Sequence, residues 1–343
     1  MKKIAIIGSG SWGCALAIHA ANLGNNVTIW SFSDEEANII NNERKCKFLP
    51  NARMPENILC STNMEEVVAD SDIILHVTPS KFVRETIKKY KMYVKDQILA
   101  VCSKGFETDT LYTLSEIVEE EMPNVKYGIL CGPSHAEEVS LQIPTAIVIA
   151  SKNDDVLHTI QNTFMDEHLR IYTSTDVKGV ELGAALKNII AFCAGIAVEQ
   201  NLGDNTLAAL ITRGLKEITN LGIAMGANKE TFYGLTGLGD LIVTCLSEHS
   251  RNRRAGRCIG RGLTIEETKK GKVNYRTDSF GNVHGIIGKA SFDDAKLAEN
   301  LKAFVEAIMK VKPSTVKGAY VKNISISSTM GPGVKIDLNS FDK

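Results

Sequence analysis

Short apolar runs alternate with longer amphipathic stretches through the first half of the chain. The runs have the length and β-branched content of buried strands, whereas residues 80–91 and 110–121 repeat their apolar positions at helical spacing. Strands that alternate with helices predict a parallel sheet covered on both faces, as in the α/β class. The expected strands are residues 3–7, 27–30, 72–78, 97–103 and 126–131, with 146–150 and 170–173 as further strands that close the domain.

The pattern changes at two places along the chain. Residues 34–57 are polar and irregular and contain Pro50 and Pro55, so we expect a helix and a loop there. From residue 176 the strand signals stop, and residues 176–200 and 205–226 show helical periodicity. The sequence therefore predicts a second domain that is helical.

A glycine-rich turn joins the first expected strand to an apolar helix. Gly8, Gly10 and Gly13 have G-x-G-x-x-G spacing, which allows a tight turn, a close approach of the backbone to a diphosphate, and close packing of helix on strand. The helix N-terminus offers free N–H groups to phosphate oxygens. A glycine-rich turn in an unrelated α/β protein is the alternative. With a second strand following on schedule, we favour a dinucleotide-binding domain of the doubly wound, Rossmann type over residues 1–175.

The end of the second strand bears on the choice of dinucleotide. Ser31, Phe32 and Ser33 stand where a site that prefers NAD carries an acid for the ribose 2′-hydroxyl, and Asp34 comes late. A neutral strand end does not repel a 2′-phosphate. We therefore expect that both NAD and NADP are accepted as cofactors.

Composition limits the class of protein. Apolar residues make up 44% and charged residues 23% of the 343 residues, which is typical of a soluble globular protein. The N-terminal apolar run has five residues, so we expect no signal peptide, and we expect no later segment of membrane-spanning length. Eight scattered cysteines without C-x-x-C spacing indicate buried thiols in a reducing cytoplasm, and neither disulfides nor a metal site.

The net charge of −1 hides an asymmetry. Residues 269–343 hold 13 Lys and Arg against 7 Asp and Glu, and the first 268 residues hold 26 against 33. All cysteines lie in the first part. The shift indicates two segments with different histories or different partners. We expect a helical substrate domain over 176–268 and a small α+β segment over 269–343.

Several polar residues stand where ligands collect in α/β proteins, beyond the carboxyl ends of strands. Lys104 and the turn 132–134 follow strands, and a solvated loop residue is the alternative for Lys104. Lys187 lies among apolar residues of the first long helix, where its ammonium group could instead reach water from the edge of the apolar face. Gly237 to Asp240 form a tight turn that presents a carboxylate.

A basic run follows that turn. Ser250 could cap a helix whose first turn holds Arg251 and Asn252, and a capped helix start with an arginine suits a phosphate group. A solvated basic face is the more common meaning of a run such as 251–254.

Taken in order, these motifs resemble the bacterial NAD(P)-dependent glycerol-3-phosphate dehydrogenases over residues 1–268. The resemblance rests on residues 8–13, 103–105, 131–136, 186–188, 237–240 and 250–252. It implies interconversion of dihydroxyacetone phosphate and sn-glycerol 3-phosphate for glycerophospholipid synthesis in the cytoplasm, and the family often forms homodimers.

The resemblance also implies roles for single residues. Lys187 is the expected general base, with Lys104 and Asp240 as further catalytic residues, Asp240 orienting the lysines and Thr244 the substrate hydroxyls. A lysine acts near neutral pH only where burial or a neighbouring cation lowers its pKa. The expected substrate-binding residues are Lys104, Gly132, Ser134, Lys187, Asp240, Thr244, Ser250, Arg251 and Asn252, and the expected cofactor-binding residues are Gly8, Gly10, Ser11, Trp12, Gly13, Phe32, Lys104, Ala136 and Arg251.

The end of the chain departs from that family. The family continues with a Val-Glu-Gly segment that touches the cofactor and with further helices, which this chain lacks after Thr268. Residues 271–337 instead resemble the C-terminal part of ribosomal protein L-one, through 271–278, 284–292, the helix 293–311, Lys312-Pro313 and 327–333. The chain is therefore interpreted as a chimera with a truncated helical domain.

Only one end of the ribosomal family's RNA-binding domain is present, with strand patterns at 283–291 and 318–328 around the helix. This piece could pack as a small βαβ-like unit with exposed edges. Two alternatives to an active dehydrogenase follow: an RNA-binding chain that uses the basic tail, and a catalytically impaired product. Weak RNA binding is expected at most, because the tail has few aromatic side chains for stacking.

Overall fold

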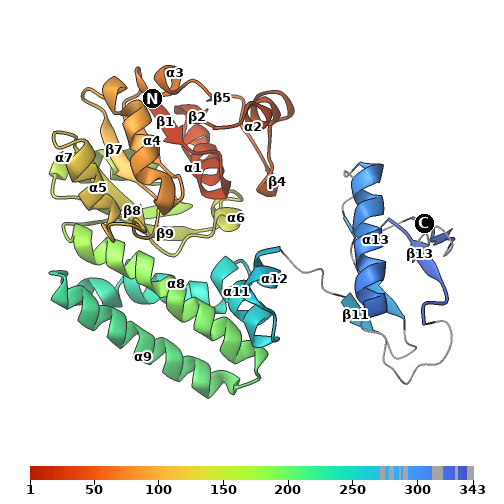
Figure 1. Ribbon diagram of the computed structural model, residues 1–343. Coiled ribbons are helices and arrows are strands. Elements are labelled where there is room, and N and C mark those ends of the chain that lie inside the picture. The colour runs from red at the N-terminus through yellow and green to blue at the C-terminus, as the bar shows by residue number, and fades with distance from the viewer. Residues whose placement is uncertain are drawn as a thin grey trace. The chain divides into compact units, whose positions relative to one another are not determined.

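The computed structural model describes residues 1–270, 275–277, 282–285, 287–288, 293–310, 320–328 and 331–337 (Figure 1). These residues form two compact units, 1–263 and 264–343. The first unit contains a sheet domain and a set of helices, and each unit is described separately below.

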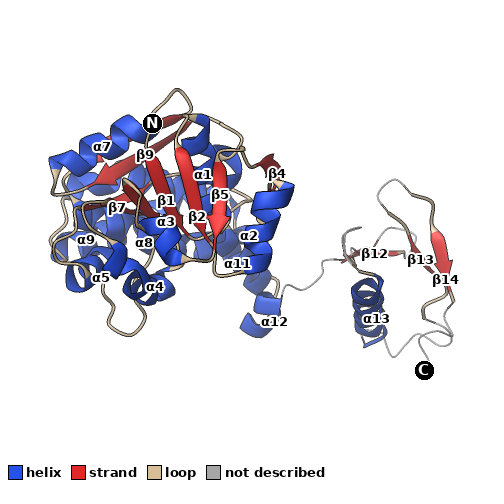
Figure 2. Cartoon of the chain, turned by 90° about the horizontal axis from the view of Figure 1, so that it is seen from above, coloured by secondary structure: helices blue, strands red, loops and turns tan. Residues whose placement is uncertain are grey.

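An eight-stranded sheet forms the centre of the first unit (Figures 1 and 2). Its strand order is β10-β9-β8-β7-β6-β1-β2-β5, so the first strand of the chain lies inside the sheet. The strands are β1 (Lys3–Ile7), β2 (Asn26–Trp30), β5 (Ile58–Ser61), β6 (Ile73–His76), β7 (Ile98–Val101), β8 (Tyr127–Cys131), β9 (Thr145–Ala150) and β10 (Leu169–Ser174). The doubly wound α/β class and all seven expected strands are confirmed.

One expectation about the sheet is wrong, and one about residues 34–57 is incomplete. The sheet is not parallel throughout, because β9 runs antiparallel to β8, with Ile129 opposite Ala150. The link between these strands holds only the one-turn helix α6 (Ala136–Val139), which is too short to carry the chain back for a parallel crossover. The segment expected as a helix and loop also contains the hairpin β3 (Lys45–Cys46) and β4 (Leu49–Arg53), and β5 follows it.

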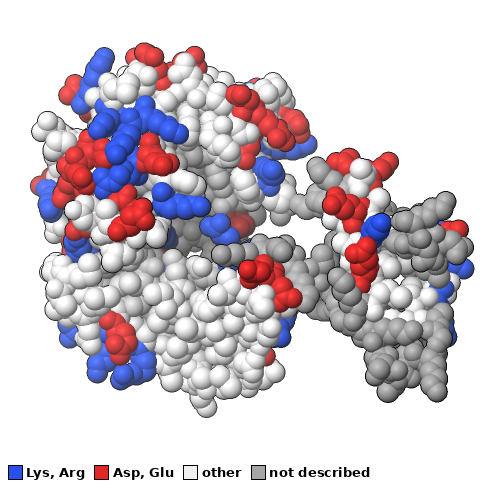
Figure 3. Space-filling view, in the orientation of Figure 1, with Lys and Arg blue, Asp and Glu red and all other residues white. Residues whose placement is uncertain are grey.

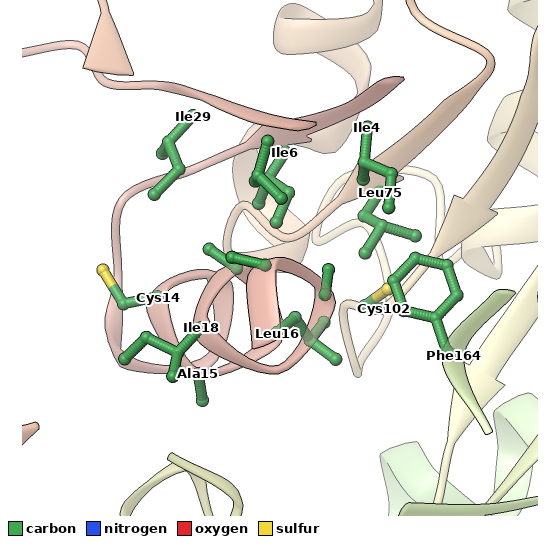
Figure 4. Close-up of a cluster of buried hydrophobic side chains, with 14 of the residues drawn as sticks. Ile4, Ile6, Cys14, Ala15, Leu16, Ile18, Ile29, Leu75, Cys102 and Phe164 are labelled. Atoms are coloured by element: carbon green, nitrogen blue, oxygen red, sulfur yellow. The ribbon is translucent and has the colours of Figure 1, made fainter. Parts of the chain in front are cut away.

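Alternate side chains of β1 point into two separate cores. Ile4 and Ile6 pack on the face covered by α1 (Ser11–Asn22), α6 and α7 (Asp154–Phe164), as Figure 4 shows for α1. Ala5 and Ile7 pack on the opposite face, under α3 (Met64–Val68), α4 (Val83–Tyr90) and α5 (Leu114–Glu121). Helices therefore cover both faces, and the glycine-rich turn after β1 is fixed between the two layers.

Shorter elements are α2 (Asp34–Asn38), η1 (Ile39–Glu43), η2 (Ser80–Phe82) and η3 (Lys91–Tyr93).

The helical part of the first unit is built around α8 (Val177–Glu199). Around it lie α9 (Gly203–Ala224), η4 (Lys229–Tyr233), η5 (Leu235–Gly239), α10 (Asp240–Leu246) and α11 (Arg251–Gly260). Two glycines let α8 and α11 touch, since a Cβ atom on Gly195 would lie 2.0 Å from the carbonyl oxygen of Arg253, and one on Gly256 would lie 1.9 Å from that of Phe192. This contact fixes the start of α11 against α8.

Helix α8 is long and apolar enough to cross a membrane by length and composition. The expectation that no segment reaches that length is therefore wrong. More than half of its most apolar stretch is buried inside the protein, and it carries the buried side chains of Glu181 and Lys187. A core helix meets the same criteria, because packing on several sides requires apolar residues all round.

The second unit contains α12 (Ile265–Lys270), α13 (Asp294–Lys310) and four short strands, β11 (Tyr275–Thr277), β12 (Val283–Gly285), β13 (Ile324–Ile326) and β14 (Val334–Ile336). The expected helix is confirmed as α13. Within the described ranges these strands form two antiparallel pairs, β11 with β12 and β13 with β14, and not the βαβ-like arrangement that was expected. Parts of the motifs at 271–278, 284–292, 312–313 and 327–333 lie outside the described residues.

Candidate active site

The glycine-rich turn has the shape that a dinucleotide needs. Gly8 has a φ of +126°, and a Cβ atom on Gly13 would lie 2.0 Å from the carbonyl oxygen of Gly8, so both positions require glycine. A Cβ atom on Gly10 would meet nothing within 4 Å, which leaves open space beside the turn. No side chain caps the N-terminus of α1, so its first N–H groups are available to phosphate oxygens. The residues therefore fit NAD or NADP.

The other expected cofactor residues lie near this turn or at neighbouring strand ends. Ser11 and Trp12 begin α1, and Trp12 packs against the core on that face of the sheet. Ala136 is buried at the start of α6, which packs on α1. Phe32 follows β2 and is 80% exposed, so it offers an apolar surface to a ligand and takes no part in the core.

Lys187 is buried in the middle of α8, 6% exposed. Its Nζ donates a hydrogen bond to Oδ1 of Asp240, which is 1% exposed, and a second one of 2.9 Å to Oγ1 of Thr244. The alternative of a lysine that reaches water from the edge of the helix is wrong, because α10 covers it. Asp240 is the first residue of α10, and the preceding residues form the π-helical turn η5, so the expected tight turn is a helix start.

Lys104 approaches the same carboxylate from the sheet. It follows β7, and its Nζ donates to Oδ2 of Asp240 at 2.8 Å and to the carbonyl oxygen of Gly132 at 2.9 Å. Gly132 has a φ of +154°, and a Cβ atom there would lie 2.8 Å from the Cα atom of Ile147. One carboxylate therefore holds two ammonium groups from two different domains.

The two lysines respond differently to this environment. Burial, together with the charge of Lys104, lowers the pKa of Lys187 to about 8, against the opposing effect of Asp240. Burial also acts to lower the pKa of Lys104, but the Asp240 carboxylate outweighs it and raises that pKa. Lys104 therefore stays charged, while Lys187 can exchange a proton near neutral pH.

The basic run begins helix α11 as expected. The Ser250 side chain accepts a hydrogen bond from the backbone N–H of Arg253 at 3.2 Å and caps the helix. Arg251 is exposed in the first turn, and Asn252 donates to Oδ1 of Asn188 at 2.8 Å. Because Asn188 follows Lys187 in α8, this contact brings the helix start close to the buried lysine. Ser134 is half-buried, and its hydroxyl donates to the carbonyl oxygen of Gly132.

Sequence reasoning gave no role to three sets of polar side chains. Glu181 is buried in α8 and accepts hydrogen bonds from the backbone and hydroxyl of Ser115. The rings of His135 and His249 lie 5.6 Å apart. The carboxylate of Glu36 accepts a hydrogen bond from the hydroxyl of Ser9, which lies in the glycine-rich turn. No short motif contains any of these contacts, so only the fold could find them. Among the described residues, no group of three or more His, Cys, Asp or Glu side chains could hold a metal ion.

The chain has a doubly wound domain with an open diphosphate turn. This domain is joined to a helical domain that buries a lysine of lowered pKa. Together these features define a nucleotide-dependent dehydrogenase with two domains. The chain matches the model of the NAD-dependent glycerol-3-phosphate dehydrogenase N-terminus over residues 3–157 and that of the C-terminus over residues 176–312. It belongs to the bacterial NAD(P)-dependent glycerol-3-phosphate dehydrogenase family.

Two relatives and a solved structure agree with this family assignment. A glycerol-3-phosphate dehydrogenase [NAD(P)+] of Fusobacterium nucleatum is 53% identical over 275 residues, which are 79% of this chain and 82% of the relative. That of Carboxydothermus hydrogenoformans is 42% identical over 313 residues, covering 90% and 91%. The crystal structure of the Coxiella burnetii glycerol-3-phosphate dehydrogenase matches with a TM-score of 0.76 at 32% identity, over 90% of this chain and 89% of that one.

Proposed function

We propose that this chain interconverts dihydroxyacetone phosphate and sn-glycerol 3-phosphate with NAD or NADP, and so supplies glycerol phosphate for glycerophospholipid synthesis in the cytoplasm. The observation that carries the proposal is that the buried Lys187 and the half-buried Lys104 both donate to the buried carboxylate of Asp240. It joins a proton-exchanging amine to the nucleotide domain. Family membership gives the same reaction through the names of the relatives.

Lys187 moves the proton in this proposal. A secondary alcohol that loses a hydride also loses its hydroxyl proton, and a ketone that gains a hydride gains one. A pKa of about 8 lets the Lys187 ammonium group give that proton and the neutral amine take it. Thr244 and Asp240 orient the Nζ atom, and the charged Lys104 binds the oxygen that carries developing negative charge.

The start of α11 binds the substrate phosphate. Arg251 supplies a guanidinium group, Asn252 a side-chain amide, and Ser250 the cap that fixes the first turn. The helix dipole and the free N–H groups favour an anion at this end. Gly132 and Ser134 contact the substrate from the other domain.

Cofactor residues hold the dinucleotide across the carboxyl ends of the strands. Gly8, Gly10 and Gly13 shape the turn, and the first N–H groups of α1 bind the diphosphate. The bound cofactor supplies the nicotinamide carbon that gives or takes the hydride. The further contacts in the proposal come from Ser11, Trp12, Phe32, Lys104, Ala136 and Arg251.

The test is oxidation of NADH and of NADPH at 340 nm with dihydroxyacetone phosphate, on purified chain of verified mass. Turnover that depends on the ketone supports the proposal. Binding of the cofactor without any turnover would contradict it and favour the catalytically impaired product.

We also propose that residues from about 269 onwards derive from a ribosomal protein of the L-one family, joined to a dehydrogenase that lacks its last helices. Two observations support a junction in this region: the compact first unit ends at Leu263, and the match to the Fusobacterium relative spans 275 of the 343 residues. The match to the Carboxydothermus relative is longer, at 313 residues. The family's C-terminal model, however, continues to residue 312, across the proposed junction. Peptide mapping of the natural protein, with peptides that span residues 260–285, tests the junction directly.

RNA binding by the basic tail is the second candidate function, and the excess of six positive charges over residues 269–343 is the observation that favours it. Such binding would weaken steeply as salt rises. A filter-binding assay of the full chain at low and high salt decides this: salt-sensitive retention of RNA supports it, and no retention at either salt removes it.

A homodimer is proposed from the family alone, and size-exclusion chromatography with light scattering measures it.

A further inference from the structure

A carboxylate occupies the end of β2 that the sequence presents as neutral. Helix α2 begins three residues after Ser31 and brings Glu36 back toward the glycine-rich turn. Oε2 of Glu36 accepts a hydrogen bond of 2.6 Å from the hydroxyl of Ser9 and a longer one of 3.3 Å from that of Ser31. Ser9 lies between Gly8 and Gly10, so the carboxylate touches the diphosphate turn itself.

The position of this carboxylate is fixed by its surroundings. The backbone N–H of Glu36 donates to Oγ of Ser33, which caps α2, and the hydroxyls of Ser9 and Ser31 are joined to each other at 2.9 Å. Ser9 and Ser31 are both buried, whereas Glu36 is half-buried. One edge of the carboxylate is therefore held by hydroxyl groups while the residue still reaches the surface.

A small surface pocket opens beside Glu36. It is lined by Ser9, Glu36, Ile39, Ile40, Lys45, Cys46, Lys47 and Phe48. In a doubly wound domain the adenosine ribose lies beyond the end of the second strand, and an acid about 20 residues after the glycine-rich turn accepts from its 2′-hydroxyl. Glu36 meets both conditions, although it stands on a helix and not at the strand end.

We propose that Glu36 makes this enzyme prefer NAD over NADP, by accepting a hydrogen bond from the ribose 2′-hydroxyl and repelling a 2′-phosphate. This inference rests on the proposed function and narrows its cofactor. The strand end itself is neutral, as expected, and the carboxylate comes from the following helix. Both cofactors still fit the diphosphate turn, so the effect is one of preference.

Two of the three neighbouring cations, Lys45 and Arg44, are bonded to other groups. Lys45 and Lys47 are the cations of the pocket and are exposed, and Lys45 is paired with Glu43 at 3.2 Å. Arg44 donates to the carbonyl oxygen of Ile58, so its guanidinium group is directed to the backbone. Glu36 alone among the charged residues that line the pocket is bonded to the diphosphate turn.

The experiment measures binding without catalysis, by calorimetry of the full chain with ADP-ribose and with its 2′-phosphorylated form. We expect the natural chain to bind ADP-ribose at least tenfold more tightly, and Glu36→Gln to reduce that ratio at least fivefold. Glu35→Gln is the matched control, because it removes the same charge from an exposed neighbour on the same helix and should leave the ratio unchanged.

Two results would overturn the inference: equal or tighter binding of the phosphorylated form by the natural chain, or an unchanged ratio in Glu36→Gln. The first needs no variant, so the inference is tested even if the variant does not fold. If the natural chain prefers ADP-ribose but turns over no ketone, the proposed reaction fails while the nucleotide preference stands. If neither compound binds, both fail.

Discussion

Burying Lys187 costs stability, and the same burial lowers the pKa of its ammonium group. Lysine is almost never fully buried unless it is paired, because its charge loses hydration. Here Asp240 and Thr244 accept from its ammonium group, and Lys104 shares the same carboxylate. With two cations on one anion, the buried one gives up its proton more readily, so its pKa falls to about 8.

Replacing Lys187 by Met should lower kcat about 100-fold or more, because the proton donor and acceptor is lost. Lys178→Met is the control: this residue lies on the same helix, is paired with Glu116 away from the site, and should change kcat less than about twofold. Steady-state kinetics in both directions measure the effect. Near-normal turnover of Lys187→Met would contradict the assignment.

The pH dependence follows from the same pKa. Below pH 8 Lys187 carries its proton, and above it the amine is neutral. Ketone reduction uses the protonated form, so its rate should fall as pH rises through about 8, while alcohol oxidation should rise over the same range. Initial rates from pH 6 to 10 in both directions check this. Parallel changes in the two directions would argue against Lys187 as the titrating group.

At the scale of elements, α8 connects the two halves of the first unit. Its first turns hold Glu181 against Ser115 at the start of α5, its middle presents Lys187 to α10, and Gly195 lets α11 approach. A helix with these contacts on several sides is apolar nearly all round, as the sequence shows. The same helix therefore links the domain of the glycine-rich turn to the start of α11.

Glu181 should make stability depend on pH. Burial raises its pKa to about 7, so between pH 4.5 and 7 the folded chain binds a proton that the unfolded chain has lost. The free energy of unfolding should therefore fall as pH rises through this range, by up to about 3 kcal/mol from this residue. Urea unfolding at pH 5 to 8 should show a smaller fall in Glu181→Gln, and an unchanged one in the exposed control Glu217→Gln. An equal fall in all three chains would contradict this.

Ser250 should contribute to both stability and binding. Ser250→Ala removes the cap of α11 and should cost about 1 kcal/mol of unfolding free energy. It should also raise KM for the phosphorylated substrate several-fold, because the first turn of the helix loosens. Ser247→Ala, which removes a hydroxyl bonded only to a neighbouring backbone N–H, is the control. An unchanged KM with lowered stability would limit Ser250 to capping.

At the scale of the whole molecule, the helical part exposes much apolar surface. Figure 3 shows that the face over α8 and α9 is mostly uncharged. Five large apolar side chains in or next to these helices are each at least 41% exposed: Ile189, Leu202, Leu221, Ile223 and Met225. If the dehydrogenase part lacks its last helices, as proposed above, this surface stays uncovered.

We therefore expect the chain to melt about 5 °C or more below the Fusobacterium relative, and to bind more of an apolar fluorescent dye in its native state. Calorimetry and dye fluorescence on both proteins, at equal concentration and salt, measure this. Equal melting temperatures with no excess dye binding would mean that this surface is covered in solution.

The sequence by itself determined what depends on neighbours in the chain. Apolar periodicity placed the seven expected strands and the two long helices, glycine spacing indicated the diphosphate turn, and Ser250 indicated a helix cap. Each of these is set within about ten residues, where local sterics and hydrogen bonds act. The strand β9 was expected but its antiparallel direction was not, because that direction depends on the short link before it and on its place in the sheet.

Only the tertiary structure decided which distant side chains meet. Lys187 and Asp240 are 53 positions apart, Lys104 and Asp240 are 136 apart, and Ser9 and Glu36 are 27 apart. The buried state of Lys187 comes from the helix packed over it, and the carboxylate beside the diphosphate turn comes from a helix that folds back after a neutral strand end. Desolvation and charge pairing depend on three-dimensional distance, so they set the pKa of Lys187 and the preference proposed for the cofactor only once the chain has folded.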